Sequence, residues 1–529
     1  MIHHIHEVIP VIDLFAGPGG LSEGFWAFRS EDKNPFRICL SIEKDSYAHR
    51  TLELRSFFRQ FSIGQIPDEY YAYLRKEITR DELFNSYRSE AAAAKREAWC
   101  AELGSSDFPV EEVDARIEKA LNGSKKWVLI GGPPCQAYSI AGRSRNKGKK
   151  GYIPEKDARH FLYREYLRII ARHRPSIFVM ENVKGLLSAK VNGGRIFDHI
   201  LDDLHDPLAA VENIKHEALR YRIYSLVKPA YFPCDNARSG FTPSDYLIMS
   251  ENYGIPQARH RLILLGVRED AGDVFPGILV PKDRVNASAV LDGLPKLRSG
   301  LSRERDTTKK WKERILDIVD DTLLDEIQDE RKKDVWDRIG IALSELDAAR
   351  EQGRGGEFVP LDAGCSDNEW YYDPKLKGVC NHTTKAHMSS DLHRYLFASC
   401  FAAVHGKSPT LPEFPKKLWP EHKSAHKAGR SCNFSDRFRV QLASKPSTTV
   451  MSHIAKDGHY YIHYDPAQCR SLTVREAARL QTFPDNYFFE GTRTQQYTQV
   501  GNAVPPLLAL QLAEIVYDVL HKGKGQWTV

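Results

Sequence analysis

The sequence predicts an α/β fold built on an open, mixed sheet with one antiparallel strand. Short apolar runs alternate along the chain with amphipathic helical stretches, which is the pattern of such folds. Two runs, Trp127 to Ile130 and Ile177 to Met180, end in residues that carry chemistry, and parallel strands bring such ends to one edge of a sheet. A third run, Leu262 to Val267, is instead preceded by arginines. If those arginines share the same edge, this strand must run antiparallel to the others.

Length and composition indicate a soluble globular protein of several units. The chain has 529 residues, of which 42% are hydrophobic and 27% are charged. This length exceeds the ~150 residues of a typical domain several times over. No run approaches the ~18 apolar residues of a membrane span, and the amino terminus has no secretory pattern. We therefore expect a cytoplasmic protein without membrane contact. The net charge of +5 permits an anionic partner.

The cysteines argue against a disulfide framework. There are nine, an odd number, widely spread and without a C-x-x-C pair. Cys365, Cys380, His382 and His387 carry metal-ligating groups, but their spacing matches no standard zinc finger. We expect no metal site.

The first strand, Val8 to Phe15, runs into a glycine turn from Gly17 to Gly20, and a helix follows near Leu21. A strand, a glycine turn and a helix start form a cofactor cradle, although a plain tight turn is an equally good interpretation of this motif alone. Glu43 closes the second strand roughly 20 residues later, where an acidic residue can bind ribose hydroxyls. A solvent-facing glutamate is the alternative, and the spacing favours the ribose.

Cys135 follows the apolar run Trp127 to Ile130 and a glycine and proline turn, which is where a nucleophile would lie. A buried structural thiol is the ordinary alternative for a free cysteine. The stretch from Ile66 to Lys126, just before this strand, is helical and charged, and we interpret it as an insertion. After Ser139 the chain becomes basic and glycine-rich up to Gly151, which predicts a lid that closes on a polyanion; a solvated loop is the alternative.

Glu181 ends the next buried strand, and a carboxylate held there can act as a general acid. Its alternative is a helix-capping or salt-bridged glutamate. For Arg259 and Arg261 the alternative is surface charge at a sheet edge. From about residue 268 to 468 periodicity is poor, apart from a charged helical stretch from Trp311 to Arg350. Two polar, basic segments in this region are typical of nucleic-acid contacts or of exposed loops: Asn381 to Lys385 and Asp436 to Arg439.

Regular structure returns near the carboxyl terminus. Thr473 is the predicted N-cap of a helix that runs to Gln481, with Glu476 three residues after the cap. An apolar helix from Leu507 to Leu520 should pack back on the first domain.

Six separated blocks together resemble the DNA cytosine-5 methyltransferases that use S-adenosyl-L-methionine, of the bacterial or phage restriction-modification type. In order, the blocks are Asp13 to Gly20, Gly131 to Ser139, Glu181 to Val183, Gln257 to Arg261, Arg470 to Asp485, and Gly501 to Val504. The resemblance implies a Rossmann-like methyltransferase sheet plus a smaller, irregular target-recognition lobe. It implies a catalytic lobe from 1 to 267 with a helical insertion at about 66–126, a variable target-recognition region at 268–469, a return at 470–490, and a closing segment at 491–529.

The resemblance also implies roles for single residues. Cys135 would add to cytosine carbon 6, Glu181 would hold the ring nitrogen and amino group, Arg259 the base oxygen, and Arg261 would support the Cys135 neighbourhood. The base would be flipped out of the duplex behind the lid. The cofactor would contact Phe15, Gly17, Gly19, Glu43, Pro134, Leu162, Asn502 and Val504; DNA would contact Gln136, Ser139, Arg143 and Arg145. The acidic residue that meets the adenine in this family cannot be found from the sequence.

We therefore predict sequence-specific methylation of cytosine carbon 5 in double-stranded DNA by a monomer in the bacterial cytoplasm, associated with the nucleoid, with a cognate restriction endonuclease acting separately. An RNA cytosine-5 methyltransferase is one alternative, but the variable region of roughly 200 residues favours DNA recognition. A catalytically silent DNA-binding regulator is another. The joint presence of Cys135, Glu181 and Arg259 argues against it.

Overall fold

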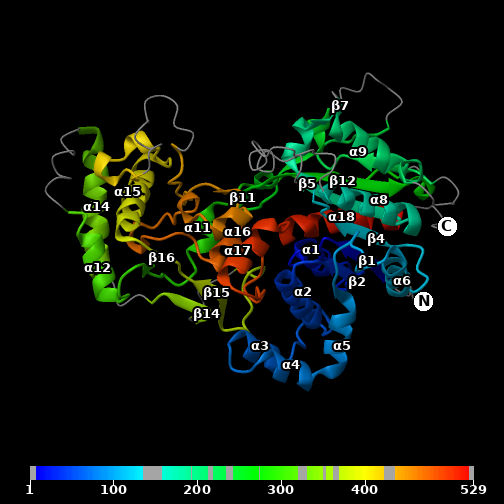
Figure 1. Ribbon diagram of the computed structural model, residues 1–529, viewed down its shortest axis with the longest axis horizontal. Helices are drawn as coiled ribbons and strands as arrows, with labels where there is room; N and C mark the ends of the chain where they lie inside the picture. The colour runs from blue at the N-terminus through cyan, green and yellow to red at the C-terminus, as the bar shows by residue number, and fades with distance from the viewer. Residues whose placement is uncertain are drawn as a thin grey trace.

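The computed structural model describes residues 8–134, 158–191, 194–211, 219–233, 242–272, 274–319, 330–348, 353–361, 368–421 and 435–522. Figure 1 shows an elongated molecule with two masses. The mass on the right contains the central sheet and is called the sheet lobe (residues 8–272 and 506–522). The mass on the left, rich in helices, is called the second lobe (residues 274–489), and α17 (Arg493–Asn502) lies between them.

The central sheet has nine strands in the order β3-β2-β1-β4-β5-β12-β8-β9, with β10 paired to β12. Their bounds are β1 (Ile9–Leu14), β2 (Phe36–Glu43), β3 (Ala98–Cys100), β4 (Val128–Gly131), β5 (Ile177–Val183), β8 (Tyr221–Tyr224), β9 (Tyr231–Phe232), β10 (Leu247–Met249) and β12 (His260–Arg268). Strands β1 to β5 are mutually parallel. Strand β12 is antiparallel to β5, which confirms the mixed sheet predicted from the position of the arginines.

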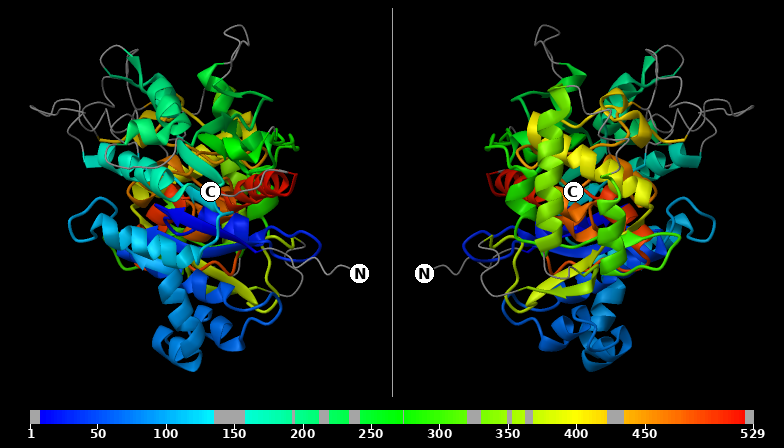
Figure 2. Two further views of the ribbon diagram at one scale, coloured as in Figure 1. Left: turned by 90° about the vertical axis from the view of Figure 1, so that its right-hand side faces the viewer. Right: turned by 90° about the vertical axis from the view of Figure 1, so that its left-hand side faces the viewer.

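Helices cover both faces of the sheet, as the side views in Figure 2 show. One face packs against α1 (Gly20–Ala27) and α18 (Pro506–Lys522), and the other against α6 (Val110–Leu121), α8 (Ala158–His173) and α9 (Ile196–His205). A Cβ on Gly24 would lie 2.4 Å from the Cβ of Ala509, so glycine allows α1 and α18 to touch. The carboxyl-terminal helix therefore packs on the first domain, as predicted. The stretch Arg493–His521 has the length and hydropathy of a membrane helix, but 67% of its most apolar window is buried inside the molecule.

The region 66–126 is only partly an insertion, which corrects the sequence-based boundary. Helices α3 (Asp68–Leu74), α4 (Arg80–Ser86) and α5 (Arg88–Glu97) follow α2 (Ser46–Arg59) and lie outside the sheet. The next element, β3, is the edge strand of the central sheet, and α6 covers that sheet. Three strand residues after an alanine-rich helix are too short a run to show a period of two. We call residues 60–97 the helical insertion.

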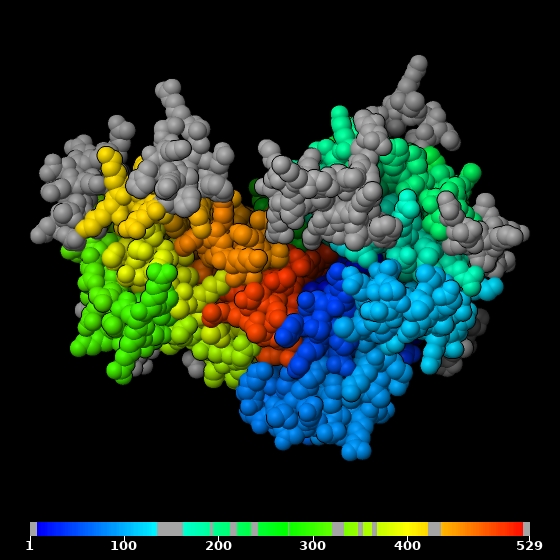
Figure 3. Space-filling model, in the orientation of Figure 1, coloured from blue at the N-terminus to red at the C-terminus, as the bar shows by residue number. Residues whose placement is uncertain are grey.

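The helical insertion connects the two lobes. Tyr73 Oη and Arg80 Nη1 both donate to Glu490 Oε1, at 2.5 and 2.7 Å. Lys375 Nζ of the second lobe donates to the carbonyl of Ile66 at 3.2 Å. Figure 3 shows the insertion, in blue, adjoining yellow-green residues of the second lobe. One apolar cluster also spans both parts, because Tyr70 of the insertion and Leu376 of the second lobe are buried in it together.

The second lobe contains more regular structure than its sequence predicts. Within the described residues, the expected helical stretch from Trp311 to Arg350 contains α12 (Thr308–Leu316) and α14 (Glu330–Ala348). The longest missed element is α15 (Ser389–His405), which is apolar around most of its circumference and so has no amphipathic period. These helices share one core. The smaller elements of this lobe are α11 (Ala287–Leu291), β13 (Gly300–Leu301), β14 (Gly355–Pro360), β15 (Gly378–Thr383), β16 (Ala386–His387) and β17 (Ser447–Thr448).

Helix α16 (Val474–Leu480) begins as predicted, with a capping box between Thr473 and Glu476. The Glu476 carboxylate also accepts a hydrogen bond from each terminal nitrogen of buried Arg470, at 2.7 and 2.6 Å. The remaining short elements are α10 (Pro207–Ala210), β6 (Lys190–Val191), β7 (Gly194–Arg195) and β11 (Gln257–Ala258).

Candidate functional site

One cavity of about 480 Å³ lies at the carboxyl ends of the parallel strands, and we call it the reaction cavity. Its wall includes seven of the eight residues predicted to bind a cofactor: Phe15, Gly17, Glu43, Pro134, Leu162, Asn502 and Val504. Three of the predicted catalytic residues, Glu181, Arg259 and Arg261, line the same cavity. The sheet therefore brings together groups that are spread over almost the whole chain.

The glycine turn after β1 forms the open side of the cradle. Phe15 has φ of 57°, a left-handed conformation that is rare for a bulky residue, and Gly17 has the same φ. A Cβ on Gly17 would meet nothing within 4 Å, so this part of the backbone faces open space. Gly19 does not line the cavity. A Cβ there would lie 2.9 Å from Leu52 Cδ1 and 3.0 Å from Tyr487 Oη, so packing explains this glycine.

Glu43 fixes the cradle by joining β2 to the glycine turn. Its Oε2 accepts the Gly17 amide at 2.8 Å, and its Oε1 accepts the Asp45 amide at 2.8 Å. Burial raises the pKa of the Glu43 carboxyl, and these amide donors oppose that rise.

Asp13, at the end of β1, is a cavity residue that the sequence-based assignment lacked. The side chain is fully buried, and Oδ2 accepts the Ser22 hydroxyl at 2.6 Å. No described residue donates to Oδ1. Burial raises the pKa of Asp13 to about 7. A polar residue closing an otherwise apolar strand was the only sequence indication of this role.

The wall beyond β3 supplies a candidate for the missing acidic residue. Ala101, Glu102 and Leu103 line the reaction cavity directly after that strand. Glu102 is about half exposed and forms an ion pair with Lys44 at 2.9 Å. Because the sequence does not reveal β3, it does not reveal the residue that follows it either.

The catalytic side of the cavity is organised around Glu181. Its Oε1 lies 2.8 Å from Arg261 Nε on the neighbouring strand. A Cβ on Gly132 would lie 3.1 Å from its Oε2, so the loop after β4 passes directly beside the carboxylate. Asn182 Nδ2 donates to the Pro133 carbonyl at 3.3 Å and ties this loop to β5. The chain that leads to Cys135 therefore starts next to Glu181.

Arg259 has a different environment from Arg261. It is 1% exposed, and its Nη1 donates to the carbonyls of Val450 and Gly501, at 2.9 and 3.2 Å. Burial, with the nearby charge of Arg261, holds the pKa of its guanidinium well below the ordinary value. Arg259 thus connects β12 to the second lobe and to α17, whereas Arg261 faces Glu181.

Several predicted residues lie outside the described residues: Cys135, Gln136, Ser139, Arg143 and Arg145. The segment from Asn381 to Lys385 is neither a nucleic-acid surface nor an exposed loop along most of its length. Asn381 and His382 are buried, and His382 Nδ1 shares a 2.8 Å hydrogen bond with Thr473 Oγ1 in the core. In the other segment, Arg437 is about half exposed and pairs with Asp457 at 3.4 Å.

The glycine cradle opens into the same cavity as the carboxylate of Glu181 and its partner Arg261. This arrangement is typical of a group-transfer enzyme that holds an organic cofactor beside its substrate. The chain belongs to the C-5 cytosine-specific DNA methylase family, whose sequence profile matches residues 89–207 and 237–517. It is accordingly a DNA methyltransferase acting at carbon 5 of cytosine, which confirms the predicted family and activity.

Curated relatives match over most of the chain. The type II methyltransferase M.Bpa9945I of Bacillus paralicheniformis is 31% identical over 528 residues, covering 97% of this chain and 99% of its own. The type II methyltransferase M.DdeI of Desulfomicrobium norvegicum is 26% identical, covering 95% and 87%. The DNA (cytosine-5-)-methyltransferase M.ApeKI of Aeropyrum pernix is 28% identical, covering 76% and 83%. Among solved structures, the Entamoeba histolytica methyltransferase EhMeth covers 97% of this chain and 99% of its own, at 13% identity and a TM-score of 0.41.

Proposed function

We propose that this enzyme methylates cytosine within one short sequence of double-stranded DNA, with S-adenosyl-L-methionine as its cofactor, as the modification enzyme of a restriction-modification system. The observation that carries the proposal is the meeting of the glycine cradle with the Glu181–Arg261 pair in one cavity. Two relatives that match over most of their length are named type II methyltransferases, and these names support the biological setting.

The residues around the cradle fit the proposed cofactor. The cavity volume of about 480 Å³ lies within the ~300–1,000 Å³ of small-molecule sites. Glu43 is placed to meet ribose hydroxyls, and Glu102 is our candidate for the acidic residue that meets the adenine. The unpartnered Oδ1 of Asp13 suits a cationic group. When bound, the cofactor supplies a methyl group activated by a sulfonium. Pro134, Leu162, Asn502 and Val504 would form the walls around it.

The chemistry of the base falls to the protein. Cytosine carbon 5 is a weak nucleophile, so the Cys135 thiolate would add to carbon 6 and make the ring electron-rich. Glu181 would supply a proton at the ring nitrogen as charge develops there, and would hold the adjacent amino group. Once carbon 5 carries the methyl group, loss of the carbon-5 proton to water, return of the ring-nitrogen proton to Glu181 and release of the thiolate would restore the aromatic ring.

For the base oxygen we favour Arg261. The sequence predicts this contact at Arg259. Nη1 of each arginine donates to backbone carbonyls, but only Arg261 also pairs with the carboxylate that would hold the base. An arginine already oriented by Glu181 can present its remaining N–H groups to an oxygen without further reorganisation. We assign Arg259 the task of holding the segment after β17, at Val450, and α17, at Gly501, against the start of β12.

The same proposal places DNA between the lobes. Reaching carbon 6 requires the cytosine to leave the duplex, and the segment from Gln136 to Gly151 would close behind it. Gln136, Ser139, Arg143 and Arg145 would contact the DNA from this segment. Residues 1–267 and 491–529 would form the catalytic part and 268–469 would read the target, with 470–490 leading back. We propose a monomer in the bacterial cytoplasm and a separate cognate endonuclease.

The test is transfer of labelled methyl from S-adenosyl-L-methionine to mixed-sequence duplex DNA, with the product read at single-base resolution. Cys135→Ser should abolish transfer, and Cys100→Ser, which changes an exposed thiol elsewhere, should leave it intact. Methylcytosine at one recurring motif supports the proposal. Label in transfer RNA and none in duplex DNA would overturn it, as would binding of DNA without any consumption of cofactor.

A further inference from the structure

A second cavity, of about 1010 Å³, lies on another part of the sheet lobe and shares no lining residue with the reaction cavity. Its floor is the first half of β2, and its sides come from α5 and α6. Val8, Asn34 and Asn122, which precede β1, β2 and β4, also line it. The cavity therefore faces the amino ends of the parallel strands, opposite the edge where the reaction cavity opens. We call it the cationic groove.

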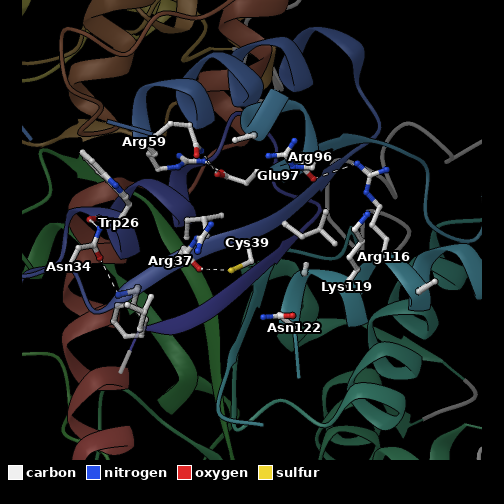
Figure 4. Close-up of a pocket in the computed structure, with 18 of the residues that line it drawn as sticks. Trp26, Asn34, Arg37, Cys39, Arg59, Arg96, Glu97, Arg116, Lys119 and Asn122 are labelled. Atoms are coloured by element: carbon white, nitrogen blue, oxygen red, sulfur yellow. Dashed lines mark hydrogen bonds and ion pairs between the residues drawn. The ribbon is translucent and has the colours of Figure 1, made fainter. Parts of the chain in front are cut away.

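Four basic side chains line this groove without a carboxylate partner among the described residues: Arg37, Arg96, Arg116 and Lys119. Figure 4 shows Arg96, Arg116 and Lys119 gathered on one side of it. Of the two acidic residues in the wall, Glu97 is occupied by Arg59 at 2.6 Å, and Glu112 attracts Arg116 one helical turn away without an ion pair between them in the described structure. The wall therefore keeps an excess of positive charge. Elsewhere arginines such as Arg80 and Arg168 are paired. Unpaired positive charge gathered in a concave site favours an anionic occupant.

Arg59 adds a buried group that points to the same conclusion. Its side chain is 3% exposed, and Nη2 donates to Glu97. Its Nε and Nη1 have no hydrogen-bond partner within the described chain; Nη1 is 4.0 Å from the nearest Glu23 oxygen. Buried donors are nearly always satisfied, and these two belong to a residue that lines the groove. The Arg59 guanidinium therefore adds a buried positive charge behind the wall of the groove.

The floor of the groove distinguishes a polypeptide from other anions. Strand β3 pairs with β2 only from Ser41 to Glu43, so the outer edge of β2 has no strand neighbour between Arg37 and Leu40 in the described structure. An unpaired strand edge accepts an extended peptide through main-chain hydrogen bonds, and nucleic acid has no equivalent row of amides. Ala93, Ala115 and Ala120 line the sides and leave room for side chains.

We propose that the cationic groove binds an extended, acidic segment of a partner protein, in which carboxylates alternate with apolar residues. The main chain would pair with the free edge of β2, the apolar side chains would lie beside the small alanines of the sides, and the carboxylates would meet the four cations. Because the groove opens at the amino ends of the strands, the partner would remain bound while DNA occupies the reaction cavity.

The experiment uses the full chain and a fluorescein-labelled peptide of alternating valine and glutamate, with binding followed by fluorescence anisotropy. Arg96→Glu combined with Arg116→Glu should weaken binding by roughly tenfold or more, because two cations become repulsive. Ala115→Trp should also weaken binding, since it fills the groove without changing its charge. Lys95→Glu is the matched control, because it reverses one positive charge on α5, as Arg96→Glu does, at a residue that does not line the groove. It should leave the affinity for the peptide within twofold of wild type.

Thermal unfolding of each variant shows whether it is folded. Absence of binding to the folded wild-type protein would overturn the proposal. So would equal losses in Lys95→Glu and in the double variant, which would mean attraction to net charge alone. Displacement of the peptide by a single-stranded oligonucleotide that depends on Arg96 and Arg116 would assign the groove to nucleic acid and also overturn it. None of these results depends on methyl transfer.

Discussion

Arg261 and Glu181 form an ion pair across neighbouring antiparallel strands, with 2.8 Å between Nε and Oε1. Glu181 lies opposite Ile263 and Arg261 lies opposite Val183, so the two side chains are diagonal neighbours on one face of the sheet. Each is only 13–15% exposed, and what is exposed opens into the reaction cavity. The carboxylate and the guanidinium therefore orient each other before any substrate arrives.

Arg261→Ala should lower the single-turnover rate of methyl transfer by roughly 10²–10³-fold, because it removes a preoriented donor beside the reacting base. Cofactor affinity should change little, since the cradle is built from other strands. Rapid-quench assays and equilibrium binding separate the two effects. A wild-type rate with DNA saturating would contradict the assignment.

Arg259→Leu should act mainly on stability, because the carbonyls of Val450 and Gly501 lose a buried donor. Each unsatisfied buried group costs roughly 1–3 kcal/mol, so the melting temperature should fall clearly below that of Arg261→Ala. Calorimetry of the two variants side by side provides the comparison. An Arg259→Leu protein with wild-type melting and a selectively lost rate would instead support the base-oxygen role predicted from the sequence.

Gly132→Ala should slow methyl transfer while leaving cofactor binding intact. The new Cβ would lie 3.1 Å from Glu181 Oε2, so the carboxylate must move by a few tenths of an ångström, and catalytic geometry is sensitive to such shifts. The matched control is Gly340→Ala in α14, where a Cβ meets nothing within 4 Å. That change should leave the rate unaltered. Equal rates for both variants would show that the carboxylate position tolerates the displacement.

Asp13→Asn should remove part of the pH dependence of stability. The pKa of Asp13 is about 7 in the folded protein and 3.8 for the free side chain, so the folded state binds this proton more tightly. Its contribution to the free energy of unfolding is therefore largest below about pH 4, falls as the pH rises to about 7, and is level above that. The full decline is on the order of 4 kcal/mol.

Urea unfolding of wild type and Asp13→Asn at about pH 5.5 and about pH 8.5 measures this difference. Wild type should lose more stability than the variant between the two values. The slope that remains belongs to other buried groups. Glu43, whose pKa is raised, acts in the same direction, whereas His382, whose pKa burial lowers to about 4, acts in the opposite direction. Parallel slopes would mean that Asp13 is already ionised in the folded protein at the lower pH.

Glu490→Ala should loosen the contact between the helical insertion and the rest of the molecule. Tyr73 and Arg80 both lose their acceptor, and we expect destabilisation on the order of 2 kcal/mol, because Arg80 keeps its second partner Glu53. The KM for DNA should rise as the lobes lose their fixed orientation. Glu77→Ala, which removes an exposed pair with Arg75, should change neither value.

The sheet could be predicted from sequence where its strands are continuous apolar runs, as in β4 and β5. It could not be predicted at β3, whose three residues follow an alanine-rich helix, and Glu102 was missed for that reason. Helix α15 was missed for the opposite reason: burial on most sides removes the amphipathic pattern. An element can be predicted when it has a strong hydrophobic period and enough residues to show that period; β3 is too short and α15 has no such period.

The sequence predicts which residues line the candidate site better than it predicts which group each of them contacts. Composition alone does not distinguish the six separated blocks from packing motifs. Their order, and their positions at strand ends, predict that Glu181 and the arginines lie at one edge of the sheet. The choice between Arg259 and Arg261, two residues apart, depends on the register of β12 against β5, which is a long-range property of the sheet. Asp13 was missed because its unpartnered oxygen arises only from three-dimensional burial.

The apolar cluster shared by the helical insertion and the second lobe makes specificity difficult to transplant. Leu376, Cys380 and Phe488 are buried in the same cluster as Phe57 and Tyr70. A chimaera that takes only the variable region from a relative would therefore pack core residues of the relative against the insertion residues of this chain. If the variable region reads the target as proposed, we expect that exchange of target preference between such enzymes requires residues 60–97 to be exchanged with the variable region, although residues 98–267 separate the two in the chain.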